Sequence, residues 1–282
     1  MAERTSNRRA EAALGPAVGL GDRSAAMIVS EQKHFIYVRI PKTASTSVSS
    51  ALEGYHRTAA DQRLFARVMR RIIPNSRNHL WVNFRAHSHW GLQAAREVLP
   101  RDFFASAFKF AVGRHPFSRM TSVYNHVMRH RHVPEFADVY APIYRERPGL
   151  NRFVAMLPEF TLPPQASLLI DYEGRVLANA VIRMERMAEE TAPIFARLGI
   201  EAEIPRLNEG GYTEDEALTD VSRAIIRDLY RIDFEVFGYD SEGLVQPRSP
   251  NAAEAAKWGA ALARKGAWDF SPWEPVPLAA LS

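Results

Sequence analysis

Residues 34–47 read HFIYVRIPKTASTS, and this stretch decides the fold. Its first half is rich in β-branched and aromatic side chains and ends at Pro41, which predicts a buried strand with a defined end. Its second half is a loop of small and hydroxylated residues. A helix is predicted to follow at residues 46–55, where Val48, Leu52 and Tyr55 recur at helical spacing. This order of elements puts the loop at the carboxyl end of a strand, where ligands bind in open α/β sheets.

Strands and helices alternate along the rest of the chain. Further strands are predicted at residues 107–113 and 181–184, and a helix from Pro116 to about residue 130 follows the first of them. Residues 131–148 contain three prolines and are expected to form a loop. Other helices are predicted at about residues 61–73, 90–99, 149–157, 188–198 and 216–231. The alternation predicts an α/β fold of three layers, in which helices flank a central parallel sheet.

The composition separates one main domain from two ends. Of the 282 residues 46% are hydrophobic, which is enough to bury a sizeable core. We expect a flexible leader at residues 1–30, the main domain at 31–240, and a C-terminal helix with an extended tail at 241–282. The tail is a candidate homo-oligomer contact, because its tryptophans can pack on the domain, on a second subunit or on sugar rings. These are Trp258, Trp268 and Trp273.

Cysteine content and charge exclude several classes of protein. The chain has no cysteine, which excludes a disulfide scaffold, a thiolate metal site and a cysteine nucleophile. The net charge of +4 favours anionic ligands, but no block of like charge indicates nucleic-acid binding. No apolar run approaches the ~18 residues of a membrane helix, and residues 1–30 lack the apolar core of a signal peptide. We therefore expect a cytoplasmic location, with peripheral membrane association as the alternative.

The loop after the first strand is a candidate anion site. Small residues at a helix N-terminus expose backbone N–H groups, and the helix dipole adds partial positive charge. The loop is not a Walker A motif, since no pair of glycines spans it and its lysine opens the loop. An ordinary hydroxyl-rich helix cap is the alternative. The residues expected to hold the anion are Pro41, Lys42, Thr43, Ala44, Ser45, Thr46 and Ser47.

A second candidate anion site follows residues 107–113. Arg114 leaves the end of this strand, and Ser122 lies eight positions later, about two turns along the next helix. A guanidinium and a hydroxyl in this arrangement can hold one phosphate. Two anion sites at two strand ends predict one ligand with two separated anionic groups. A surface arginine and an unrelated buried serine are the alternative.

Together the two stretches resemble PAPS-dependent carbohydrate sulfotransferases of the Golgi and bacterial type, known as sulfotransferase family 2. The loop resembles the 5′-phosphosulfate loop of that family, and residues 108–124 resemble its 3′-phosphate segment. Weaker similarities at Gln165, 183–185 and 233–239 extend the resemblance over about residues 33–240. It implies a three-layer, P-loop-like fold, PAPS (3′-phosphoadenosine 5′-phosphosulfate) as sulfuryl donor, a carbohydrate acceptor, and no metal.

The sequence departs from the family pattern at two positions. His115 stands where Asn or Asp is usual, and Gly113 stands where a larger residue is common. Both residues adjoin Arg114, to which the resemblance assigns the 3′-phosphate together with Ser122. We expect binding to survive these departures, with altered affinity.

The resemblance also implies catalytic roles. Lys42 would stabilise the charge that develops on the leaving phosphate oxygen. The segment His87-Ser88-His89 resembles the base region of uronyl 2-O-sulfotransferases, and two histidines two residues apart face the same side of an extended segment. We therefore expect His89, or else His87, to be the general base. A surface pair and a zinc pair are the alternatives for these histidines, and Glu53 and Glu185 are the alternative bases.

Two other functions are compatible with parts of the sequence. One is a P-loop-type nucleotide kinase or NTPase, but the lysine is not in the Walker A position and no clear Walker B strand follows. The other is a non-catalytic module that binds phosphorylated ligands or nucleic acid. RNA binding would require aromatic residues interleaved with basic ones, and the sequence shows no such pattern.

Overall fold

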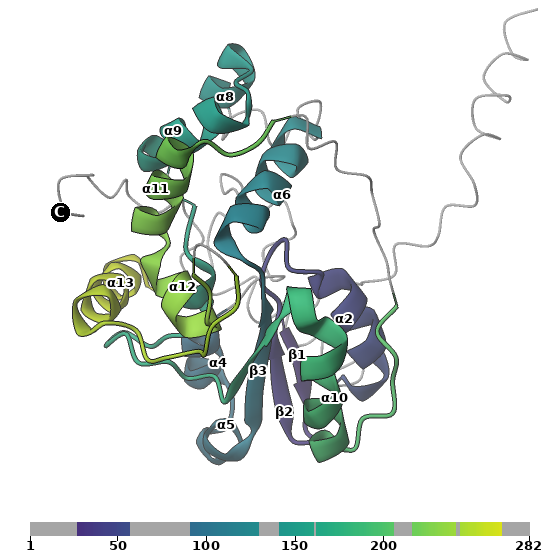
Figure 1. Ribbon diagram of the computed structural model, residues 1–282. Helices are drawn as coiled ribbons and strands as arrows, with labels where there is room; N and C mark the ends of the chain where they lie inside the picture. Colours follow the sequence, from purple (N-terminus) through teal and green to yellow (C-terminus); the bar gives the residue numbers. More distant parts are fainter. Residues whose placement is uncertain are drawn as a thin grey trace, which may run out of the picture.

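The computed structural model describes residues 27–56, 91–129, 141–160, 162–205, 216–240 and 243–266 (Figure 1). The predicted helix at 61–73 and the candidate bases His87 and His89 lie outside these residues, as do Trp268 and Trp273.

The described strands form one sheet in the order β1–β2–β3–β4. Its members are β1 (Met27–Ser30), β2 (Phe35–Val38), β3 (Phe108–Gly113) and β4 (Ala180–Arg183). β2, β3 and β4 are parallel, as the alternation of strands and helices predicted. β1 pairs antiparallel with β2, so the sheet is mixed and not wholly parallel.

The prediction of a flexible leader up to residue 30 is wrong at its end, because Met27–Ser30 is strand β1. All four of its residues are buried. A strand of this length shows no readable period in the sequence, and its hydrogen bonds come from β2, which follows it in the chain.

Helices cover both faces of the sheet (Figure 1). Alternate side chains of a strand point to opposite faces, so Tyr37 of β2 belongs to one apolar cluster and Ile36 to another. The cluster that contains Tyr37 is closed by α2 (Ser45–Leu52) and α10 (Met187–Leu198). The other cluster is closed by α4 (Leu92–Val98), α5 (Arg101–Ser106), α6 (Pro116–Arg129), α9 (Leu150–Phe160), α12 (Arg231–Phe237) and α13 (Ala252–Lys265).

A group of helices lies beyond the carboxyl ends of the strands (Figure 1). It contains α6 and α9 together with α8 (Ala141–Glu146) and α11 (Asp220–Leu229), and α11 packs against both α6 and α9. Within the described residues, short 3₁₀ helices lie at η1 (Glu53–Tyr55), η3 (Gln165–Leu168) and η4 (Met184–Arg186). In this group, α8 corrects the predicted loop at 131–148. Pro142 lies in its first turn, where a proline removes no intrahelical hydrogen bond.

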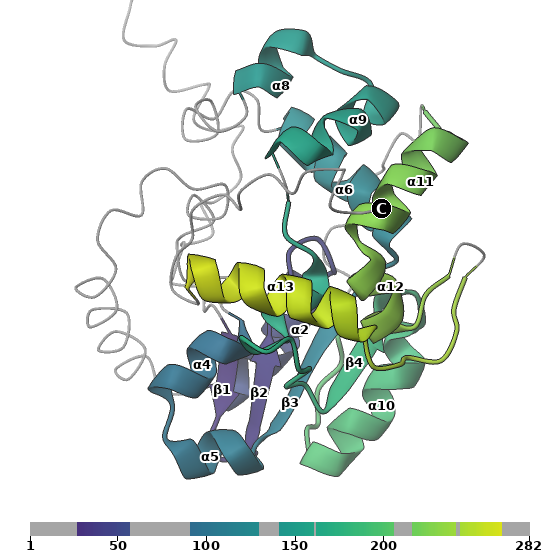
Figure 2. The same ribbon diagram turned by 90° about the vertical axis from the view of Figure 1, so that its left-hand side faces the viewer.

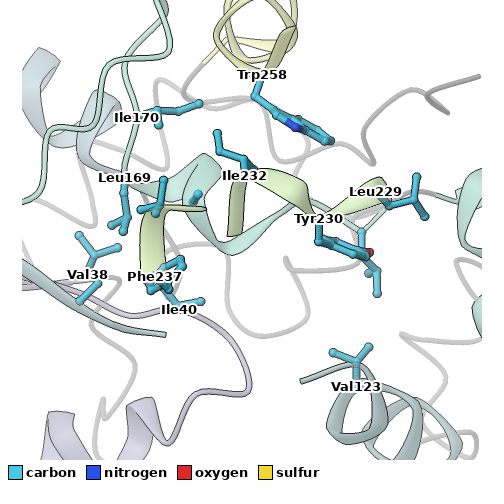
Figure 3. Packing of buried hydrophobic residues seen from close by; sticks show 14 of the residues in the cluster. Val38, Ile40, Val123, Leu169, Ile170, Leu229, Tyr230, Ile232, Phe237 and Trp258 are labelled. Carbon is cyan, nitrogen blue, oxygen red and sulfur yellow. The ribbon is translucent and has the colours of Figure 1, made fainter. Parts of the chain in front are cut away.

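The C-terminal helix α13 crosses the side of the molecule that carries α12 and η3 (Figure 2). Trp258 of α13 is 1% exposed and lies in the same core cluster as Ile232 and Phe237 of α12 (Figure 3). Of the three arrangements that the sequence left open for the tail tryptophans, Trp258 adopts packing on its own domain. Among the described residues, no helix has both the length and the apolar composition that crossing a membrane requires.

Candidate functional site

Parallel pairing brings the two candidate anion sites to one edge of the sheet. Val38 of β2 is the partner of Ala111 in β3, so both strands run in register toward the same edge. The loop that begins at Pro41 and the segment that begins at Arg114 therefore leave from adjacent strand ends. This is the edge at which open α/β sheets bind ligands.

The loop after β2 has an unusual backbone. Lys42 and Ala44 have φ angles of 67° and 58°, in the left-handed region that non-glycine residues rarely adopt. Left-handed residues in a loop can turn successive N–H groups to one side, as in anion-binding nests. Such backbone strain is often found at ligand sites, so the backbone of the loop, like its composition, is compatible with a candidate anion site.

The hydroxylated side chains of this loop differ in burial. Thr43 is fully buried, and its Oγ1 donates to the Ile40 carbonyl oxygen at 2.9 Å, so this hydroxyl shapes the loop. The N-cap residue of α2 is Ala44, which forms no side-chain cap bond, so the hydroxyl-rich cap is not formed at that position. Ser45 and Ser47 are buried, Thr46 is exposed, and Lys42 and Ala44 are half-buried.

Arg114 is half-buried at the end of β3, and its Nε donates to Ser118 Oγ at 3.1 Å. Ser118 is a residue that sequence reasoning missed, because Arg114 precedes α6 and the i, i+4 contact rule holds only for two residues of one helix. Ser122 lies one turn further along α6 and is buried. The segment thus carries a cation and a nearby hydroxyl beside the strand end.

The peptide of Arg114 is held by Gln165 of η3, a residue to which the sequence resemblance gave no role. Gln165 Oε1 accepts from the Arg114 N–H at 2.9 Å, and Gln165 Nε2 donates to the Arg114 carbonyl oxygen at 2.8 Å. Gln165 is in turn bound by the buried carboxylate of Asp233, which accepts from the Gln165 N–H at 3.0 Å. No feature of the local sequence around Arg114 signals these partners.

His115 acts as a cap for α6. Its Nδ1 accepts from the Phe117 N–H at 3.3 Å, and its Nε2 donates to the Asp240 carbonyl oxygen at 2.9 Å. An Asn or Asp side chain at the start of a helix makes the first of these bonds, so His115 replaces the usual residue in that role. Burial lowers the pKa of His115, which favours the neutral ring that this arrangement needs.

Gly113 makes room for an aromatic ring. A Cβ atom on Gly113 would lie 2.1 Å from Cδ1 of Phe237, which belongs to α12. The space that a larger residue would take at the end of β3 is therefore filled from another element.

The two alternative carboxylate bases are poorly suited to that role. Both oxygens of Glu185 accept hydrogen bonds, one from the His115 N–H at 2.9 Å and one from the Tyr239 hydroxyl at 2.7 Å. Glu53 follows the C-terminal end of α2, which is about 12 Å long at ~1.5 Å per residue, whereas the loop lies at its N-terminus. Among the described residues, no group of three or more His, Asp and Glu is placed to hold a metal ion.

A model of a known protein family matches most of the chain. The model, described as sulfotransferase family, matches residues 25–240. The chain belongs to the sulfotransferase family. The matched span of this sulfotransferase begins just before β1, contains both candidate anion sites, and ends before α13. The search of curated proteins and the search of solved structures gave no match.

The match confirms the resemblance to sulfotransferases that the sequence predicted, and sulfuryl transfer is the general chemistry of this family. An enzyme of this kind must bind an anionic sulfuryl donor and an acceptor. The edge of the sheet at β2 and β3 offers cations and N–H groups for the donor.

Proposed function

We propose that this sulfotransferase moves a sulfuryl group from PAPS to a hydroxyl of a carbohydrate by in-line displacement and releases PAP (3′-phosphoadenosine 5′-phosphate). The observation that supports PAPS most directly is the pair of anion sites at adjacent parallel strand ends. PAPS carries two separated anionic groups, the 5′-phosphosulfate and the 3′-phosphate. In this proposal the fold is P-loop-like, because the first loop holds the 5′-phosphosulfate.

The donor atoms at this edge fit the two groups. The strained loop with Lys42 suits the 5′-phosphosulfate, since its backbone and cation both favour anionic oxygens. Arg114, with Ser122 on the helix that follows, suits the 3′-phosphate, since a guanidinium matches the geometry of phosphate oxygens. The remaining loop residues, Pro41 and Thr43 to Ser47, shape the first site or contribute N–H groups.

In the transfer step, an acceptor oxygen bonds to sulfur while the bond between sulfur and the phosphate oxygen breaks. Lys42 would stabilise the negative charge on that departing oxygen. A general base would take the proton of the acceptor hydroxyl. We assign the base to His89, with His87 as the second choice, because Glu185 is bound at both oxygens and Glu53 lies at the far end of α2.

Calorimetry with PAP, ATP and single-stranded RNA tests the donor class. We expect tight binding to PAP alone, and a preference for ATP would favour a nucleotide kinase or NTPase instead. Sulfate transfer from labelled PAPS to a panel of glycans, with a small alcohol and a tyrosine peptide as further acceptors, tests the carbohydrate acceptor. Transfer to the peptide and to no glycan would overturn that part.

Arg114→Ala tests the assignment of the 3′-phosphate. Adenosine 5′-phosphosulfate lacks that phosphate, so the variant should lose much more affinity for PAP than for this compound. Arg129→Ala is the matched control, because Arg129 is an exposed arginine at the far end of α6. Equal losses for both ligands would remove Arg114 from the 3′ site.

A further inference from the structure

Gln165 makes a contact that the reaction itself does not explain. The residue is 0% exposed, and its side-chain amide binds both polar groups of a single peptide residue, Arg114. The parallel ladder between β3 and β4 ends with the pair Gly113 and Arg183. The amide of Gln165 therefore continues the hydrogen bonding of β3 by one residue, at the position that carries the candidate phosphate cation.

The orientation of the Gln165 amide is fixed by its surroundings. Nε2 faces two acceptors, the Arg114 carbonyl oxygen at 2.8 Å and Asp233 Oδ2 at 3.3 Å, while Oε1 faces the Arg114 N–H at 2.9 Å. A reversed amide would set its oxygen against both acceptors and its NH₂ group against a donor. Only one orientation satisfies the site, so the contact has a defined direction.

A buried network supports this amide from behind. Asp233 of α12 also accepts from the Gln165 N–H at 3.0 Å and from the Ala166 N–H at 2.8 Å. Burial raises the pKa of Asp233, and the charge of the buried Arg119 side chain opposes that rise. Arg119 Nη2 donates to the Pro163 carbonyl oxygen at 3.4 Å, close to the start of η3. The start of η3 is thereby tied to both α6 and α12.

We propose that Gln165 is a positioning residue of the donor site, which holds the Arg114 peptide so that the guanidinium meets the 3′-phosphate. This inference rests on the proposed function. Gln165 acts only through Arg114. Small displacements of a binding group have large effects, and ~1 Å can cost as much as ~10²-fold in rate. A purely structural role, in which Gln165 only ties η3 to α12, would lower stability without changing which ligand is preferred.

Gln165→Met separates these two roles, because methionine keeps the length of the side chain and removes its hydrogen bonds. We expect the Kd for PAP to rise about 10-fold, while the Kd for adenosine 5′-phosphosulfate changes by less than about 2-fold, a difference of ~1.4 kcal/mol. Ser167→Ala is the matched control. Ser167 is also buried in η3, but its hydroxyl donates to the Pro164 carbonyl oxygen. It should leave both Kd values unchanged.

Gln165→Glu provides a second variant with a conservative rescue. The ionised carboxylate still accepts from the Arg114 N–H but repels the Arg114 carbonyl oxygen and Asp233. On protonation the side chain regains a donor, so the preference for PAP should recover toward that of the wild type as the pH falls. Each measurement is compared with the wild type at the same pH, which removes the titration of PAP itself.

The outcomes distinguish this inference from the proposed function. A wild-type protein that shows no preference for PAP over adenosine 5′-phosphosulfate would overturn both. A wild-type protein with that preference, together with a folded Gln165→Met variant that keeps it, would overturn the positioning role alone. If Gln165→Met does not fold, the decision passes to Gln165→Glu, and a variant that keeps the wild-type preference for PAP at alkaline pH, where its carboxylate is ionised, rejects the inference.

Discussion

The loop after β2 and the segment after β3 leave the same edge of the sheet but are held in different ways. Two hydrogen bonds in the loop are local: Thr43 donates to the Ile40 carbonyl oxygen, and the Ala44 carbonyl oxygen accepts from the Ser47 N–H at 3.0 Å. The segment after β3 depends on partners that are distant in sequence. Arg114 is bound by Gln165, 51 residues away, and His115 by Glu185 and Asp240, 70 and 125 residues away.

This difference indicates where substitutions should act. A change in the loop alters the strained backbone or the cation directly. A change that affects the segment can arise from η3, η4 or α12, because Gln165, Glu185 and Phe234 of these elements each contact it. The candidate site in the loop therefore depends on local backbone geometry, whereas the candidate site after β3 depends on tertiary packing.

The largest effect is expected at the cation of the loop. Lys42→Ala should lower kcat by about 10²–10³-fold with every acceptor, the size typical of losing one group that stabilises a developing charge. Steady-state sulfate transfer measures this effect. Lys33→Ala is the control, because Lys33 precedes β2 at the opposite edge and donates to the Gly199 carbonyl oxygen. A Lys42→Ala variant with normal turnover would show that the loop binds without contributing to catalysis.

The next effect concerns the end of β3. Gly113→Ala should lower the free energy of unfolding by about 1–3 kcal/mol, because the new Cβ would overlap the Phe237 ring. Urea denaturation measures the loss, and adding Phe237→Leu should restore part of it. Gly54→Ala is the matched control, since a Cβ at Gly54 meets no atom within 4 Å. Equal results for the two glycine variants would contradict the role given to Phe237.

A smaller effect is expected from the loop backbone. Ala44→Val places a β-branched residue at a φ angle of 58° and should cost about 1–2 kcal/mol, whereas Ala44→Gly should stay within about 0.5 kcal/mol of the wild type. Thermal unfolding ranks the variants. PAP titration should show the same order, because the strain belongs to the proposed site. A valine variant as stable as the glycine variant would argue that the loop relaxes easily to another conformation.

The smallest effect is a dependence on pH at the segment. Because burial lowers the pKa of His115, the unfolded chain binds this proton more readily than the folded chain. The stability contributed by the neutral ring is therefore lost as the pH falls below the unfolded value of about 6.5. His115→Asn keeps a cap for α6 and should lose less stability than the wild type between about pH 7.5 and pH 5. Parallel curves of Tm against pH would contradict this reading.

What the sequence could predict follows from the same contrast. Strands β2, β3 and β4 could be predicted, as could the places of the loop and of Arg114 at strand ends, because strand composition, Pro41 and the spacing of apolar residues are local signals. The edge strand β1 and the bond between the Gln165 amide and the Arg114 peptide could not be predicted, since each depends on a partner elsewhere in the fold. His115 and Gly113 were recognised only as departures from a pattern. The structure explains both departures: His115 caps α6 through the Phe117 N–H, and Gly113 leaves room for the Phe237 ring.

The part of the chain that matches the family is shorter than the part that forms the hydrophobic core, because α13 packs into that core. The family match ends at residue 240, yet α13 lies so close to the turn at residues 172–174 that a Cβ on Gly259 would be 2.6 Å from the Tyr172 carbonyl oxygen. A chain cut at residue 240 would uncover the apolar surface on which Trp258 rests, and exposed surfaces of that kind promote self-association. Helix α13 thus covers apolar surface of the domain. A chain that ends at the family boundary would leave that surface exposed to solvent.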